Sequence, residues 1–421
     1  MRLGIGVGVG RQRFAGGFAD SYSARVLADG GAIESLSCVA NASTLLQQAS
    51  LLFIPSGYKA GVAYSALPNN GNGDLTWTRN STANRTLANG NIGSVGANVP
   101  RLSYMYGSCP SALLEPQRTN SIPNSLGGGT GYDTVGTVTV TNNFATAPDG
   151  TTTATRVNAS AGVWRYRNNN TTSLLANTTY TFSVWVKSNT SGNQTFRMYL
   201  YNATFSNDFV ATPTWQRFTF TLISPASVTQ IHGLGSDTLN SAADILTWGW
   251  QIESGSYSTT YIPTTTATAT RLADTFTRNN IYTNGLISSS GGTWYVELKN
   301  NVPYLRDNGN ALFIGDTTFG STNAFNISVV SGTQRLVIYK RVSGAFTSLR
   351  TTASDNVKIA IKWNGTTADV FENGVKVVSA TAFPTTLMEF LYGQQGVPVF
   401  IQAMALYNTP LSDSECIALT T

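Results

Sequence analysis

The clearest shortage in this sequence is of charge. Only 11% of its 421 residues are Asp, Glu, Lys or Arg, against about 25% in an ordinary globular domain. Gly, Ser, Thr and Asn take their place, and aromatic residues reach 11%. A polar but uncharged composition suits β-sandwiches, because their loops need turn-forming residues and their strands favour Thr and aromatic side chains.

Histidine and cysteine are too scarce for the common metal sites. His232 is the single histidine, and Cys38, Cys109 and Cys416 are widely spaced with no CxxC pair, so we expect no metal and no other cofactor. We expect the cysteines to be buried small apolar residues of a protein that folds in a reducing cytoplasm. A bridge between Cys38 and Cys109 is the open alternative.

The sequence offers little for catalysis. His232 lies in TQIHGLG with no GxSxG motif, so a serine-histidine arrangement is not indicated. The two facing carboxylates of a glycosidase have no sequence signal beyond acidity. We therefore expect a histidine at a turn or core edge and a protein that is not an enzyme, with a polysaccharide depolymerase as the less favoured alternative.

Dense basic faces and long apolar runs are also missing. The net charge is only +5 and the basic residues are scattered, so a nucleic-acid partner is not expected. No run approaches the roughly 18 apolar residues of a membrane span. The apolar run Leu3–Gly10 is short and half glycine, unlike a signal peptide.

The first part of the chain predicts an arm and a small domain. Residues 1–30 are Gly-rich and form either a disordered tail or an arm docked on another subunit. Residues 31–123 predict a small mixed docking domain that ends at Ser111–Asn120, SALLEPQRTN. We expect this motif to act as a hinge, with its leucines buried and Glu115 paired or capped locally with Arg118.

The rest of the chain has the cadence of antiparallel β-sandwiches. Short alternating segments such as YTFSVWVKS recur between Gly, Asn and Ser turns over 124–263, which is typical of a sandwich or jelly roll. A Thr-rich linker at 264–272 precedes a second sandwich at 273–421. Within it, Glu372–Val375 predicts an Asn-Gly hairpin, and Ser412 with Glu415 predicts a helix cap. The fold class is therefore mainly β.

Three parts of the chain resemble known families. IPSGYKAGVAYSALPNNGNGDLTWTRNSTANR and LLEPQRTN resemble the N-terminal part of phage virion structural proteins of the tail-fibre, head-fibre or capsid-decoration type. TYTFSVWVKS and WGWQIESGSYSTTYIPT are similar to a carbohydrate-binding-module-like jelly roll. KIAIKWNGTTADVFENGVKV is similar to a concanavalin-A-like or laminin-G-like lectin sandwich.

The resemblance implies a role on a bacteriophage particle. It implies a homo-oligomer assembled in the host cytoplasm and exposed on the virion exterior, with residues 1–120 contacting other virion proteins. The outer modules would attach to host or environmental polysaccharide. A purely structural decoration protein without a ligand is the alternative, and the position on the head, neck or tail stays open.

Candidate sugar contacts come from aromatic side chains beside hydrogen-bonding residues, because sugar sites combine ring stacking with a few polar groups. The candidates are Trp164, Arg165, Tyr166, Arg167, Tyr199, Tyr201 and Trp250. The alternative is that these rings fill the core of a sandwich.

Overall fold

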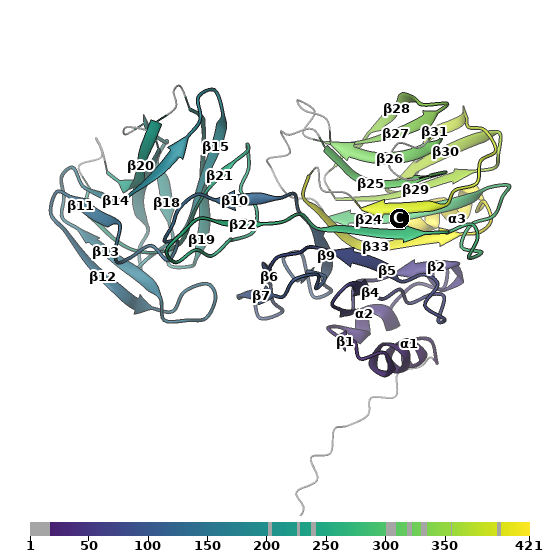
Figure 1. Cartoon of the computed structure of the whole chain (residues 1–421), viewed down its shortest axis with the longest axis horizontal. Helices are drawn as coiled ribbons and strands as arrows, with labels where there is room; N and C mark the ends of the chain where they lie inside the picture. Colours follow the sequence, from purple (N-terminus) through teal and green to yellow (C-terminus); the bar gives the residue numbers. More distant parts are fainter. Residues whose placement is uncertain are drawn as a thin grey trace, which may run out of the picture.

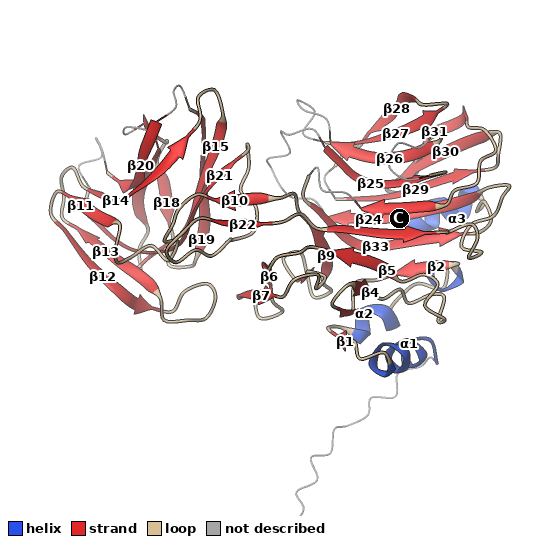
Figure 2. Ribbon diagram, viewed as in Figure 1, coloured by secondary structure: helices blue, strands red, loops and turns tan. Residues whose placement is uncertain are grey.

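The computed structural model of the chain describes residues 17–200, 204–224, 228–236, 241–299, 309–317, 322–329, 335–354, 356–393 and 397–421. Within these ranges the fold is mainly β, as the sequence predicts. Figure 1 shows two lobes, and Figure 2 shows that strands dominate both. In each lobe, antiparallel sheets pack face to face around a core.

The larger lobe combines strands from both ends of the chain, and we call it the composite sandwich. Its first sheet has the order β1 (Ala32–Ile33), β3 (Gly57–Lys59), β4 (Val62–Ala63), β5 (Leu75–Thr78), β23 (Thr275–Asn279), β32 (Phe390–Gly393), β25 (Gly309–Gly315), β26 (Ala324–Val329), β27 (Leu336–Val342), β28 (Ala345–Thr351). Its second sheet has the order β31 (Val375–Ala382), β30 (Thr367–Glu372), β29 (Val357–Trp363), β24 (Gly292–Lys299), β33 (Val399–Tyr407), β9 (Ser111–Leu114), β8 (Leu102–Ser103), with β2 (Leu51–Phe53) also paired to β33. Phe325 and Trp363 meet between the sheets with ring centroids 5.6 Å apart.

The smaller lobe comes from one continuous stretch of chain, and we call it the inserted sandwich. One sheet has the order β11 (Tyr132–Val135), β14 (Arg165–Leu174), β20 (Val228–Gly235), β16 (Gln194–Leu200), β17 (Thr204–Phe205), with β18 (Phe209–Ala211) also paired to β16. The other has the order β12 (Val138–Ala145), β13 (Ala154–Ala159), β21 (Ala243–Ser254), β15 (Thr179–Ser188), β19 (Gln216–Ile223). Phe196 and Phe218 meet between these sheets, with ring centroids 5.1 Å apart.

Two short ribbons complete the strands. β10 (Arg118–Asn120) pairs with β22 (Ala269–Arg271), so the chain enters and leaves the inserted sandwich at one place (Figure 1). β6 (Ala83–Thr86) pairs with β7 (Ile92–Val95). The amide of Ile92 donates to the carbonyl of Pro148 at 2.9 Å, which places this ribbon against the inserted sandwich.

The expected boundary between a docking domain at 31–123 and a complete sandwich at 273–421 needs correction. β5 pairs with β23, and β9 pairs with β33. Trp77 and Leu114 also belong to the same buried cluster as Ile401. The two segments therefore share sheets and core. The expected linker at 264–272 likewise contains a paired strand, β22.

The helices lie on the composite sandwich. They are α1 (Gly17–Ala28), α2 (Leu36–Ala40) and α3 (Asp413–Thr420), with a 3₁₀ turn at Leu46–Gln48. α1 falls within residues 1–30, where a disordered tail or a docked arm was expected, while residues 1–16 lie outside the described part of the chain. α3 begins with the predicted capping box. No helix in the described ranges is long and apolar enough to span a membrane.

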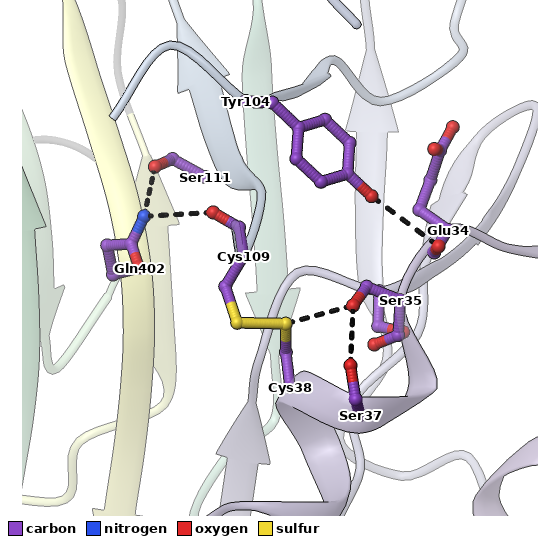
Figure 3. Close-up of a disulfide and its surroundings, with 9 residues drawn as sticks. Glu34, Ser35, Ser37, Cys38, Tyr104, Cys109, Ser111 and Gln402 are labelled. Carbon is purple, nitrogen blue, oxygen red and sulfur yellow. Dashed lines mark hydrogen bonds between the residues drawn. A yellow bond between two sulfur atoms is a disulfide. The ribbon is translucent and has the colours of Figure 1, made fainter. Parts of the chain in front are cut away.

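A disulfide joins Cys38 to Cys109, while Cys416 is free and buried. The expectation of three unpaired cysteines is therefore correct only for Cys416. The bridge ties α2 to the turn before β9, beside Gln402 of β33, whose amide donates to the Ser111 hydroxyl at 2.5 Å (Figure 3).

Five buried charged side chains meet where the two lobes join, and we call them the junction cluster. They are Arg79, Arg101, Glu115, Arg271 and Asp274. Asp274 accepts hydrogen bonds from Arg79 Nη1 at 2.8 Å and from Arg101 Nε at 3.3 Å. Glu115 accepts one from Arg101 Nη1 at 2.7 Å and pairs with Arg271. The Glu115 of SALLEPQRTN thus finds long-range partners where a local one was expected.

The junction cluster also reaches the inserted sandwich. Glu115 Oε1 accepts from the Thr260 amide at 2.9 Å, and Oε2 accepts from the Thr260 hydroxyl at 2.7 Å. Burial alone would raise the pKa of Glu115, but Arg271 and Arg101 lower it to about 2. The SALLEPQRTN segment therefore connects the two lobes through the Glu115 carboxylate. Its Leu113 and Leu114 are buried, as expected.

Candidate functional site

A cleft opens along one side of the inserted sandwich, between β11 and β12, the edge strands of its two sheets. Its volume is about 480 Å³, within the range usual for small-molecule sites. The residues that line it are Gly129, Tyr132, Asp133, Thr134, Val138, Val140, Asn142 and Tyr166. We call it the edge cleft.

A glycine-rich loop at residues 127–131 contributes Gly129 to the lining of the edge cleft. Gly127 has φ of +87°, and a Cβ there would lie 2.6 Å from Nε1 of the Trp250 indole. A Cβ on Gly128 would lie 2.4 Å from side-chain oxygens of Asn142 and Thr155. Only glycine permits this backbone shape and such close approach, so the sequence GGGTG fixes the wall of the cleft.

Tyr132 is the aromatic surface of the edge cleft. Its ring stacks on Tyr166 with centroids 5.4 Å apart and meets Trp250 edge-on at 5.2 Å. Its hydroxyl donates to the carbonyl of Asn124 at 2.7 Å. Tyr132 stays partly exposed, whereas Tyr166 and Trp250 are buried. The ring is therefore held in place by its neighbours while a surface remains open to a ligand.

The polar side chains of the cleft are Asp133, which is ion-paired, and Thr134 and Asn142, which are not hydrogen-bonded within the described residues. Asp133 forms an ion pair with Arg167, and this hydrogen bonding raises the pKa of the Arg167 guanidinium. The Asp133 carboxylate also accepts a hydrogen bond from Asn169 Nδ2 at 3.0 Å. Thr134 and Asn142 are exposed. Within the described ranges their side chains have no hydrogen-bond partner, so they are available to a ligand.

A second cavity of about 280 Å³ adjoins the edge cleft. It is lined by Asn124, Leu126, Gly128, Gly129, Asn142, Asn143, Thr153, Thr155 and Thr265. Gly129 and Asn142 line both spaces. The two cavities are therefore neighbours, and we call the pair the polar groove.

The structure places the predicted sugar contacts in three settings. Trp164, Tyr166 and Trp250 are buried in the core of the inserted sandwich, as in the alternative interpretation, while Tyr199 is buried against Arg165 and Phe205. Tyr166 and Trp250 nevertheless support Tyr132 from behind. Tyr201 lies outside the described residues.

The two predicted arginines lie on the outer face of the sheet, beyond the inner core. Arg165 places its guanidinium 5.5 Å from the Tyr199 ring centroid and 5.2 Å from that of Phe205. Arg167 holds Asp133 at the rim of the edge cleft. Sequence reasoning therefore found the supports of the cleft but missed Tyr132, Thr134 and Asn142. The one signal for them was the run of glycines directly before Tyr132.

His232 lies inside the core of the inserted sandwich rather than at its edge. Its ring centroid is 5.3 Å from Phe182 and 6.1 Å from Trp250. Neither ring nitrogen has a hydrogen-bond partner among the described residues. Burial lowers the pKa of His232 to about 3, so the imidazole is neutral at physiological pH.

The depressed pKa of His232 predicts acid sensitivity. An unfolded histidine titrates near 6.5, so below that pH the unfolded chain binds a proton that the folded chain excludes. The free energy of unfolding of the inserted sandwich should therefore be about 2 kcal/mol lower at pH 5 than at pH 7. Urea unfolding across this range measures the effect. His232→Leu should flatten the profile, and an unchanged profile in that variant would contradict the assignment.

Clusters of three or more His, Cys, Asp or Glu side chains that could hold a metal ion are absent from the described residues. The carboxylates near the edge cleft are likewise few, since its lining contains Asp133 alone. The edge cleft is therefore lined by neutral hydrogen-bonding groups, two tyrosine rings and one ion-paired carboxylate.

Comparison with known proteins finds only distant structural similarity. No family model and no curated protein matches the chain. Solved structures with distant similarity include the CBM40 module of a Ruminococcus gnavus sialidase bound to α2,3-sialyllactose. It has a TM-score of 0.24 and 18% identity, and the match covers 31% of this chain and 83% of that one.

Two further solved structures have similar scores. Domain 4 of the arabinanase AbnA of Geobacillus stearothermophilus, in complex with arabinotriose, has a TM-score of 0.28 and 16% identity over 37% of this chain and 77% of that one. Botulinum neurotoxin type C, whose cell entry depends on two ganglioside molecules, has a TM-score of 0.28 and 11% identity over 35% of this chain and 39% of that one. This chain is thus a β-sandwich protein with distant structural similarity to carbohydrate-binding modules, and the similarity does not extend to a ligand.

Proposed function

We propose that the chain is a virion structural protein of a bacteriophage, of the fibre or decoration type, that uses its inserted sandwich to bind glycans. The observation that carries the binding role is the edge cleft, in which Tyr132 is held rigidly beside the free polar groups of Thr134 and Asn142. An aromatic ring next to a few hydrogen-bonding side chains is the usual composition of a sugar site.

The virion role is supported by the resemblance of the N-terminal segment to phage structural proteins. The arrangement of the lobes is compatible with it, because β11 lies at the far end of the inserted sandwich from the composite sandwich (Figure 1). The composite sandwich, which contains residues 32–114, would contact other virion proteins. The edge cleft would then face outward on an assembled homo-oligomer, where many copies offset weak single sites.

We propose binding rather than catalysis at this cleft. Glycoside hydrolysis in most families needs two carboxyl groups on either side of the scissile bond. Asp133 is the single carboxylate among the lining residues, and Arg167 and Asn169 already engage it. The chemistry of the cleft therefore suits reversible attachment.

A glycan array tests the proposal. The full chain, coupled at high density to beads, should bind a subset of surface polysaccharides. Asn142→Ala should weaken this binding by about tenfold, because a side chain that bonds sugar hydroxyls is lost. Asn158→Ala is the matched control, since Asn158 is exposed on β13 of the same sandwich and lines neither cavity.

Two outcomes would count against the proposal. Failure to bind any glycan at high density favours the purely structural decoration protein. Equal binding by Asn142→Ala and Asn158→Ala removes the edge cleft as the site. Release of new reducing ends from host polysaccharide would instead indicate a depolymerase.

A further inference from the structure

We propose that the polar groove binds an extended, uncharged oligosaccharide and selects against acidic sugars. The inference rests on the proposed glycan-binding function and specifies the ligand class. It is drawn from the path of the groove, the chemistry of its lining and the placement of its one charge.

The path of the groove fits a chain rather than a single sugar. The edge cleft and the adjoining cavity meet at Gly129 and Asn142. Space above Gly129 is open, since a Cβ built there would meet no atom within 4 Å. A linear ligand that runs from Thr134 in the first cavity to Thr265 in the second would pass over Gly129 and beside Asn142.

The lining is rich in groups that both donate and accept hydrogen bonds. Exposed hydroxyls and amides line both cavities, from Thr134, Asn142, Asn143 and Thr265, whereas Asn124 and Thr153 are already hydrogen-bonded within the protein and Thr155 is buried. Each amide offers donors and an acceptor, and each hydroxyl can act as either. Sugar hydroxyls have the same dual character, whereas a carboxylate accepts only. The lining therefore matches neutral sugar rings better than acidic groups.

The charges around the groove point the same way. No Lys or Arg is among the described residues that line either cavity. Recognition of a carboxylate usually relies on such a cation, most often a guanidinium. The one charged lining group is Asp133, whose partner Arg167 approaches from the outer face of the sheet. Because Arg167 is already paired with Asp133, a uronic or sialic acid in the groove would find no uncommitted cation among the lining residues.

The walls are held in place before any ligand binds. Asn124 Nδ2 donates to the carbonyl of Gly128 at 3.0 Å, and its backbone carbonyl accepts from the Tyr132 hydroxyl. The hydroxyl of Tyr166 donates to the carbonyl of Gly127 at 2.7 Å. A site fixed in this way loses little conformational freedom on binding, so selectivity between similar sugars is retained.

Calorimetric titration of the full chain tests the inference. The probes are neutral gluco-, xylo- and arabino-oligosaccharides of increasing length, with oligogalacturonate and sialyllactose as acidic counterparts. Neutral chains should bind at least about tenfold more tightly than acidic chains of equal length, since each acidic group loses its hydrogen-bonding match. Affinity should rise with length until both cavities are filled.

Three variants and the salt dependence of the affinity test the inference further. Asn142→Ala, at the meeting point of the cavities, should remove the gain from length, while Asn158→Ala should keep it. Affinity for neutral chains should not change between about 0.05 and about 0.5 M salt, because an uncharged ligand forms no ion pair with the protein. Thr134→Arg should raise affinity for oligogalacturonate by supplying the missing cation.

The outcomes separate the inference from the proposed function. Tighter binding of oligogalacturonate or sialyllactose than of the neutral chains overturns the selectivity and leaves glycan binding intact. Equal affinity for one sugar and for longer chains overturns the extended path. Lack of binding to every probe and to every glycan on an array overturns the proposed function as well.

Discussion

A fragment spanning residues 273–421 should fail to fold on its own, although its sequence has the pattern of a complete sandwich. In the intact protein its two sheets continue through strands from the N-terminal part of the chain. β5 covers the edge of β23, and β9 covers the edge of β33. Removing the N-terminal part exposes both edges, which then become sites for aggregation.

The loss of core is as important as the loss of edges. The N-terminal members of the composite core are Leu51, Phe53, Ala63, Leu75, Trp77, Leu102, Ala112 and Leu114. Removal of a single large buried side chain typically costs about 2–5 kcal/mol, and a whole domain is stable by only about 5–15 kcal/mol. The remaining core therefore falls short of what folding requires.

A fragment spanning residues 121–264 should fold, because all members of its core lie within Ile122–Ile252. Circular dichroism and a urea titration of both fragments measure the contrast: a cooperative transition for 121–264 and none for 273–421. A stable, cooperative 273–421 fragment would show that the N-terminal strands are only an attachment. The sequence-based hinge at Ser111–Asn120 also predicts a stable 124–421 fragment, and the shared core predicts that only its inserted sandwich folds.

Asp274→Asn should lower the free energy of unfolding of the composite sandwich by about 3–5 kcal/mol, the usual effect of removing one partner from a buried ion pair. Asn keeps the size of the side chain but removes its charge. Arg79 and Arg101 are then left buried without the carboxylate that accepts their hydrogen bonds. The amide of Glu115 also loses its 3.2 Å contact to Asp274 Oδ2.

A surface variant provides the comparison. Asp413 pairs with Lys362 and Lys376, and its side chain is 49% exposed, so Asp413→Asn should cost less than about 1 kcal/mol. Denaturant unfolding of the two variants separates the effects, and the inserted sandwich should keep its own transition in both. Equal small losses would show that the junction cluster contributes no more than a surface ion pair.

Local features of the fold were predictable, and long-range pairing was not. The Asn-Gly hairpin is confirmed, since Glu372 pairs with Val375 around Asn373 and Gly374, both with positive φ. The capping box of α3 is confirmed for the same reason, because each depends on neighbouring residues alone. The partner of β23 is determined by the packing of the whole core. An alternating pattern of side chains predicts a strand but does not identify a distant partner strand.

The candidate site divides in the same way. Aromatic residues in strands drew attention to Tyr166 and Trp250, and the structure buries both behind Tyr132. A periodic pattern shows that a ring faces one side of a strand, but not whether another sheet covers that side. Tyr132 escapes burial because β11 is an edge strand, which only the assembled topology reveals.

The pairing of β9 with β33 delays completion of the composite sandwich until late in synthesis. Leu113 of β9 pairs with Phe400 of β33, so at about 5–20 residues per second the ribosome takes roughly 15–60 s to deliver the partner after β9 itself emerges. The inserted sandwich, complete by β21, can fold during this interval. The edges of β5 and β9 stay unpaired during this interval. We therefore expect chaperones that shield unpaired strands to bind the nascent chain.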